Sequence, residues 1–221
     1  MKGLIRNNFY SVGNSLPLLI VGELVFTILG LLFLSLKEPN SEFLATTIGG
    51  GLMGSQLGGF AGMCGTFIQK NALSKWSKFE ITLPISRTTI MQARYITFLL
   101  YILIGIIASI LTAIALFVLD LPITTERMGY MFSFGLVFGL TIPSLISPLT
   151  LIFGEDKNEV LLMISIIAGI VLFFGSSMIM TFFYPNISNL EFRTGILAFA
   201  IIGFILSYFL SLYLYKKKEL V

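Results

Sequence analysis

The chain contains no histidine and one cysteine, Cys64. The lack of histidine excludes Ser-His-Asp and Cys-His nucleophiles, histidine-ligated metals and haem with a histidine ligand. One cysteine cannot form a disulfide within the chain, and Cys64 lies in an apolar run, where a buried, unreactive side chain is expected. No G-x-x-x-x-G-K-[ST] loop is present, which excludes an ATPase of that type. We therefore expect a chain that is not an enzyme and carries no metal or cofactor of its own.

Charged residues are also scarce, at 11% of the 221 residues, whereas 56% are hydrophobic. The apolar residues gather in six nearly uncharged runs, each longer than the roughly 20 residues that a helix needs to cross hydrocarbon. Runs this continuous are not the alternating strands of a membrane barrel. We predict an all-α membrane protein with a single transmembrane domain over residues 1–221. Its six spans are expected at about 16–36, 43–69, 95–119, 128–153, 160–183 and 194–215.

The basic residues are distributed unequally between the two ends of these runs. If the six runs alternate in direction, 11 of the 14 Lys and Arg residues fall on the side that holds both termini. The positive-inside rule then predicts a multi-pass protein of the cell membrane with cytoplasmic termini. The basic residues are scattered over separate loops, so no nucleic-acid partner is expected. The cluster at 216–218 is expected to contact anionic membrane lipids.

Two stretches outside the runs have the periodicity of amphipathic helices. The first is residues 1–14, which predict a short helix lying in the cytoplasmic membrane interface. The second lies in the connection 70–94, where Leu73, Trp76, Phe79 and Leu83 share one helical face.

A helix boundary follows this second stretch. Pro84 is expected to end the short helix, because the residue before a proline is pushed out of the helical region. Ser86 is a candidate N-cap for a new helix that begins at Arg87. That helix is long enough to protrude from the bilayer into the cytoplasm.

The second predicted span is rich in glycine. Gly50, Gly54, Gly58 and Gly62 form a ladder at i+4 spacing, which lets another helix approach closely. Three arrangements fit such a ladder: packing within one subunit, a subunit interface, or the wall of a passage. All three make these glycines helix-packing candidates.

Glu23 is the ionisable residue that lies well inside a predicted span. A charge near mid-bilayer costs at least ~2.5 kcal/mol, so Glu23 is expected to face a polar cavity or a partner. Gln56 on the second span is a candidate companion. We consider both residues candidates for a translocation path, with a purely structural hydrogen bond as the alternative for Glu23.

The connection between the second and third spans contains the most specific motif, W-S-K-F-E-I-T-L-P-I-S-R over residues 76–87. It resembles the permeases of type-2 ABC exporters, in which a segment ending in Leu-Pro-(Val/Ile)-Ser-Arg follows the second of six spans. The predicted topology resembles that family over nearly the whole chain. The small size is similar to permease subunits of Gram-positive peptide exporters, such as the phenol-soluble modulin exporter.

This resemblance implies that the connection forms a coupling helix on a separate ABC ATPase, which binds the ATP and Mg. The residues it places at that contact or at the start of the following helix are Trp76, Phe79, Glu80, Leu83, Pro84, Ser86 and Arg87. It also implies two permease subunits, as a homo- or heterodimer, with two ATPase copies. An amphipathic peptide or other hydrophobic cargo is expected.

Two other classes of function remain open from the residues alone. A secondary transporter or channel working without ATP would be expected to have repeated broken helices and several ionisable groups in the membrane. Glu23 is the one ionisable residue that lies well inside a predicted span. An intramembrane enzyme is the third class, and the absence of histidine argues against it.

Overall fold

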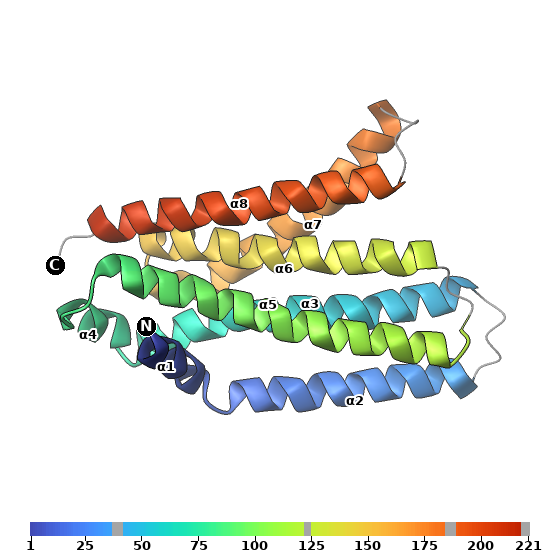
Figure 1. Cartoon of the computed structure of the whole chain (residues 1–221), viewed down its shortest axis with the longest axis horizontal. Coiled ribbons are helices and arrows are strands. Elements are labelled where there is room, and N and C mark those ends of the chain that lie inside the picture. The colour runs from blue at the N-terminus through green and yellow to red at the C-terminus, as the bar shows by residue number, and fades with distance from the viewer. Residues whose placement is uncertain (37–41, 122–124, 184–188, 218–221) are drawn as a thin grey trace.

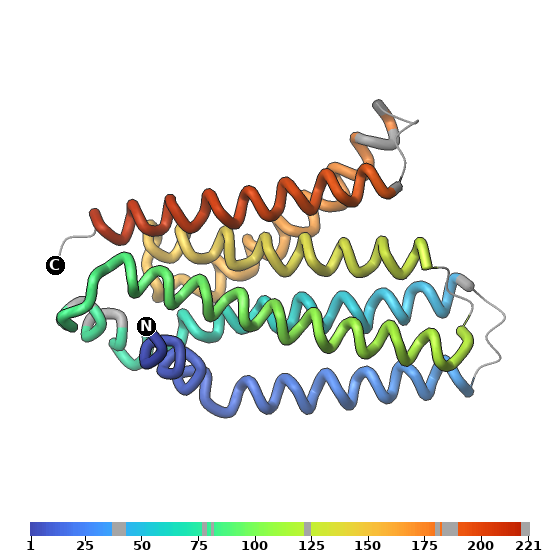
Figure 2. The backbone as a smooth tube through the Cα atoms, in the orientation of Figure 1, coloured from blue at the N-terminus to red at the C-terminus, as the bar shows by residue number. Residues whose placement is uncertain are grey.

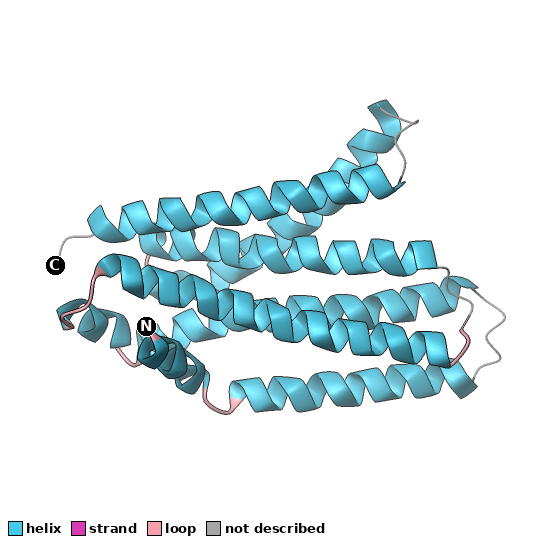
Figure 3. Ribbon diagram, viewed as in Figure 1, coloured by secondary structure: helices cyan, strands magenta, loops and turns pink. Residues whose placement is uncertain are grey.

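The computed structural model describes residues 1–36, 42–121, 125–183 and 189–217, and all secondary structure in these residues is helical (Figure 3). This confirms the predicted all-α class. The elements are α1 (Lys2–Val12), α2 (Ser15–Leu36), α3 (Glu42–Leu73), α4 (Trp76–Thr82), α5 (Arg87–Val118), α6 (Thr125–Phe153), the 3-10 turn η1 (Glu155–Lys157), α7 (Asn158–Phe183) and α8 (Asn189–Lys217).

The long helices form a bundle in which α2, α3, α5, α6 and α8 run side by side (Figure 1). The helix α7 crosses behind α6 and α8 and tilts away from them at one end (Figure 2). The start of α1, the whole of α4 and the end of α8 lie together at the opposite end of the bundle. We call this the α4 end.

Five helices in the described part of the chain are long and apolar enough to cross a membrane. They are α2, α5, α6, α7 together with η1, and α8. The predicted span 43–69 forms α3 but is not among the five, because glycine, threonine, serine and glutamine residues dilute its apolar residues. The structure places α3 in the middle of the bundle, between α2, α5 and α6. A helix shielded by its neighbours need not be as apolar as one that faces lipid.

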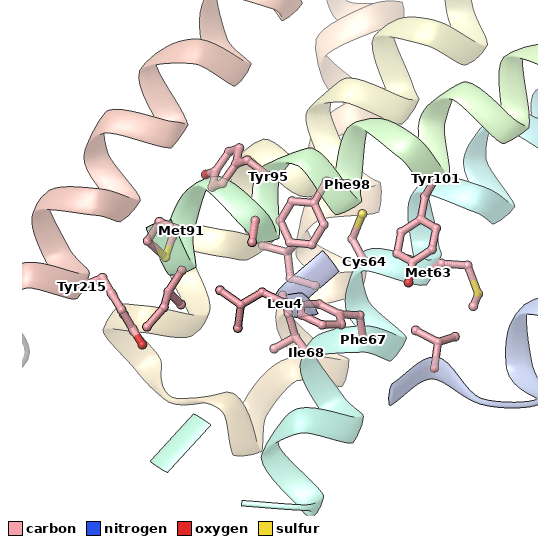
Figure 4. Packing of buried hydrophobic residues seen from close by; sticks show 14 of the residues in the cluster. Leu4, Met63, Cys64, Phe67, Ile68, Met91, Tyr95, Phe98, Tyr101 and Tyr215 are labelled. Carbon is pink, nitrogen blue, oxygen red and sulfur yellow. The ribbon is translucent and has the colours of Figure 1, made fainter. Parts of the chain in front are cut away.

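The largest cluster of buried apolar side chains lies toward the α4 end and joins α1, α3, α5, α6 and α8 (Figure 4). Phe67 of α3 and Phe98 of α5 meet edge to face there, with ring centroids 6.1 Å apart. Cys64 is fully buried in this cluster, as the sequence predicts.

The N-terminal amphipathic helix is present as α1, and it packs into the bundle as well as covering its end. Leu4, Asn8 and Val12 recur every four residues, and all three are buried. The amide nitrogen of Asn8 donates a hydrogen bond of 3.0 Å to the hydroxyl of Thr97 on α5. The sequence periodicity identified the apolar residues of this face but not Asn8.

The end of α1 is tied to α3. Gly13, with φ of 55°, ends the helix in a conformation that glycine adopts readily. The ammonium of Lys70 donates to the carbonyl of Val12 at 2.6 Å and to the hydroxyl of Ser15 at 2.8 Å. A cation at a helix C-terminus offsets the negative end of the helix dipole, so Lys70 joins the start of α2 to the bundle.

Candidate functional site

The helix α4 connects α3 to α5 and spans only Trp76–Thr82. The predicted amphipathic helix was expected to include Leu73, but Leu73 is the last residue of α3. Lys75 adopts a left-handed conformation with φ of 54°, which separates the two helices. At the other end, Leu83 is extended because Pro84 follows it, as predicted.

The start of α5 has the predicted cap. The hydroxyl of Ser86 accepts a hydrogen bond from the backbone N–H of Thr89, and α5 begins at Arg87. This confirms the N-cap assignment made from the sequence.

A buried ion pair holds α4 against α5. The Glu80 carboxylate and the Arg94 guanidinium approach to 3.8 Å, and both side chains are almost completely buried. The Arg94 guanidinium also lies over the ring of Phe67, 5.9 Å from its centroid. Burial raises the pKa of the Glu80 carboxyl, Arg94 lowers it, and Glu155 of η1 raises it again. Glu80 is therefore an anchor of α4 and not part of its exposed surface.

The exposed surface of α4 and its C-terminal connection combines apolar side chains with the hydroxyl residues Thr82 and Ser86. Phe79 is 53% exposed and Ile85 is 37% exposed. The indole of Trp76 lies against the ring of Phe79, with centroids 5.3 Å apart. The α4 segment thus presents an aromatic side chain outward while Glu80 on its other side is buried.

Arg87 connects the start of α5 to the end of α8. Its guanidinium donates to the backbone carbonyls of Tyr215 at 3.2 Å and Lys216 at 2.7 Å. The last carbonyls of a helix lack helical partners and carry a partial negative charge. Arg87 therefore joins the start of α5 to the end of α8.

The other two predicted residues, Glu23 and Gln56, lie away from α4 and line one open groove of about 320 Å³ between α2, α3 and α5. Glu23 accepts a hydrogen bond of 3.0 Å from the hydroxyl of Ser55. The amide nitrogen of Gln56 donates to the hydroxyls of Thr27 at 2.8 Å and Thr112 at 2.7 Å. The structure thus brings Glu23 and Gln56 to the same groove.

A model of the family "ABC-2 family transporter protein" matches residues 3–216. The chain belongs to the ABC-2 transporter family. This confirms the resemblance carried by residues 76–87, and the match includes both α4 and the groove. No curated protein and no solved structure matches the chain. Membership identifies a multi-pass membrane component of an ABC transporter, which is not itself catalytic.

In this ABC-2 protein the glycine ladder packs against α6. A Cβ at Gly50 would lie 3.0 Å from the sulfur of Met131, and one at Gly58 would lie 2.7 Å from the ring of Phe138. A Cβ at Gly54 would lie 3.9 Å from the ring of Phe134, whereas a Cβ at Gly62 would have no described atom within 4 Å. Three members of the ladder therefore face a helix of the same subunit.

Two contacts in this ABC-2 protein had no signal strong enough to be found from the sequence. Arg94 ends the connection 70–94, but its pairing with Glu80 depends on how α4 packs against α5. Nothing in the sequence distinguishes Thr27 and Thr112 from other threonines of apolar helices. Their role as hydrogen-bond partners of Gln56 depends on how α3 packs against α2 and α5. In the described residues, no group of three or more His, Cys, Asp or Glu side chains could hold a metal ion.

Proposed function

We propose that this chain is the membrane-spanning subunit of an ATP-driven ABC exporter. Its permease domain has six spans, namely the five helices that are apolar enough to cross a membrane and α3, which packs between them. Its α4 end faces the cytoplasm. The positive-inside bias of the sequence and membership of the ABC-2 family support this orientation and role.

We further propose that α4 is the coupling helix that contacts a separate ABC ATPase. The observation that carries this proposal is the way α4 packs: Phe79 is exposed to solvent, while Glu80 is buried against Arg94. Pro84 is also exposed, and Trp76 and Leu83 are partly exposed. An exposed aromatic side chain on a helix that is anchored by a buried ion pair suits a soluble partner that must push on the membrane domain.

The mechanical role follows from the contacts of α4. Closure of two ATPase copies on ATP would displace α4, and the Glu80–Arg94 pair would transfer that displacement to α5. Ser86 caps α5 and Arg87 links it to the end of α8, so both helices would tilt together. ATP and Mg belong to the ATPase in this scheme, and this chain supplies the path.

The proposed assembly contains two permease subunits, identical or related, and two ATPase copies. The proposed cargo is an amphipathic peptide or another hydrophobic molecule, as in exporters of the phenol-soluble modulin type. The groove lined by Glu23 and Gln56 supports this cargo class, because its walls are mostly apolar.

Co-purification of the tagged chain from its own membrane tests the coupling proposal. We expect an ABC ATPase to co-purify, and Phe79→Ala to reduce its yield about tenfold, because exposed aromatic residues commonly dominate interfaces. Phe117→Ala is the matched control, since Phe117 is an exposed aromatic residue at the far end of α5. It should leave the ATPase yield unchanged.

Two results would contradict this function. One is an unchanged ATPase yield with Phe79→Ala in a folded protein, which would remove α4 from the contact. The other is full cargo movement in vesicles without nucleotide, which would establish an ATP-independent transporter or channel instead.

A further inference from the structure

The groove between α2, α3 and α5 combines a carboxylate with apolar walls. Glu23 and Thr27 lie one turn apart on α2 and meet the neighbouring residues Ser55 and Gln56 of α3. The Ser55 hydroxyl lies 3.0 Å from a Glu23 carboxylate oxygen and 3.0 Å from the carbonyl of Leu52, so its single hydrogen is shared. Among the described residues, Glu23 thus receives a hydrogen bond from one hydroxyl, which it shares with the carbonyl of Leu52.

The orientation of the Gln56 amide is determined by its neighbours. The amide nitrogen of Gln56 donates to the hydroxyl of Thr112, which in turn donates to the carbonyl of Ala108 at 3.2 Å. In this orientation the carbonyl oxygen of Gln56 has no hydrogen-bond partner in the part of the chain that the structure describes. Gln56 is only 3% exposed, and an unpaired buried acceptor of this kind is costly.

Gly59 makes room for the carboxylate. A Cβ at this position would lie 2.9 Å from the second carboxylate oxygen of Glu23. The remaining lining is mostly apolar, and it includes Leu24, Ile107 and Leu111, whose side chains are exposed along the groove. The groove thus combines the Glu23 carboxylate with mostly apolar walls, and the unpaired carbonyl of Gln56 is buried in its wall.

We propose that this groove binds a cationic amphiphile, with a protonated amine against Glu23 and an apolar chain along Ile107 and Leu111. The inference rests on the proposed export function, for which it names the charge and polarity of the cargo group recognised. An amine supplies the hydrogen-bond donors that Glu23 and the Gln56 carbonyl lack. An anionic group would be repelled, and a neutral chain would leave both acceptors unpaired.

The depth of Glu23 favours a molecule in transit over a resident lipid headgroup. Glu23 lies eight residues into α2, which is about 12 Å from the start of the helix. An ordinary lipid keeps its headgroup at the interface, whereas an exported amphiphile must carry its amine through this depth.

Binding of radiolabelled dodecylamine to the full chain in phosphatidylcholine nanodiscs tests the proposal, with empty nanodiscs as the background. We expect saturable binding, and Glu23→Gln should weaken it about tenfold, because it removes a charge-assisted hydrogen bond. Glu23→Gln keeps an acceptor for Ser55, so the fold is preserved, and Glu23→Asp should retain most of the binding. Glu126→Gln at the far end of α6 is the matched loss of one acidic side chain and should change nothing.

A glycine pair supplies a second, independent variant. Gly59→Ala places a methyl group against the Glu23 carboxylate and should weaken dodecylamine binding, whereas Gly51→Ala, two turns away with nothing within 4 Å, should not. Equal binding of dodecanol or dodecanoate, or unchanged binding by Glu23→Gln, would overturn the proposal. Loss of amine binding when phosphatidylethanolamine is added would overturn it too, because the occupant would then be a lipid.

This measurement contains no ATPase, so it is separate from the test of the proposed function. Glu23-dependent amine binding without a co-purifying ATPase would support the proposed amine site and contradict the proposed export function. A co-purifying ATPase without amine binding would do the reverse.

Discussion

The hydroxyl of Ser207 on α8 donates a hydrogen bond of 2.5 Å to the backbone carbonyl of Ser144 on α6. Pro148 lies four residues after Ser144 within α6 and has no N–H, so that carbonyl lacks its usual partner in its own helix. Ser207 also lies 2.7 Å from the hydroxyl of Tyr95 on α5. One serine of α8 therefore satisfies the acceptor that the proline exposes and joins three helices.

Replacing Ser207 tests this relationship. Ser207→Ala should destabilise the purified chain by about 1 kcal/mol, because a buried carbonyl is left unpaired. In a Pro148→Ala background the helix regains its own N–H, so the same substitution should have a smaller effect. The measurement is unfolding in mixed micelles for all four chains of the cycle. Equal effects in both backgrounds would show that Ser207 acts only through Tyr95.

The glycine ladder offers a paired prediction within one helix. Gly58→Ala should destabilise the chain by about 1–3 kcal/mol, because the added methyl would meet the ring of Phe138. Gly62→Ala should be neutral or stabilise by up to about 1 kcal/mol, since nothing lies within 4 Å and alanine favours the helix. Thermal unfolding of the isolated chain compares them directly. An equal loss from both substitutions would contradict the packing of this ladder on α6.

The buried ion pair predicts a strong difference between single and double variants. Glu80→Ala should destabilise the chain by about 3 kcal/mol, because it leaves the Arg94 guanidinium buried without its partner. Glu80→Leu combined with Arg94→Met should recover most of that loss, since no buried charge remains. Hydrogen exchange over residues 76–82 reports whether α4 detaches in the single variant. A double variant as unstable as the single one would argue against the pair as the anchor.

The same carboxyl predicts a pH dependence of stability. Burial raises the pKa of Glu80 above its ordinary value of 4.5. The folded chain then binds a proton at Glu80 more readily than the unfolded chain does. The contribution of Glu80 to the free energy of unfolding is therefore largest below pH 4.5 and is lost as the pH rises through the folded pKa. The unfolding free energy of the wild type minus that of Glu80→Gln, measured between pH 4 and 8, should therefore be greatest at the acid end. A difference that is flat, or that grows with rising pH, would contradict this.

The sequence predicted the helices better than it predicted their faces. Apolar runs located the long helices to within about five residues, except that α5 begins eight residues before its run, at the cap predicted from Ser86. Pro84 and Ser86 determine the boundary between α4 and α5 by local chemistry that needs no tertiary contact. The resemblance placed Trp76, Phe79 and Glu80 together at the ATPase contact, whereas the structure exposes Phe79 and buries Glu80. That outcome depends on Arg94, which lies 14 residues later and reaches α4 only because the chain reverses at Pro84.

The residues alone determined that this is a helical membrane protein of the ABC-2 family, because span length, charge bias and the motif at 76–87 are properties of the linear chain. Tertiary structure decided which polar groups meet. Contacts between different helices include those of Glu23 with Ser55, of Gln56 with Thr27 and Thr112, and of Ser207 with the backbone carbonyl of Ser144. In an apolar surrounding, each polar group takes whichever partner the packing of the helices brings within reach.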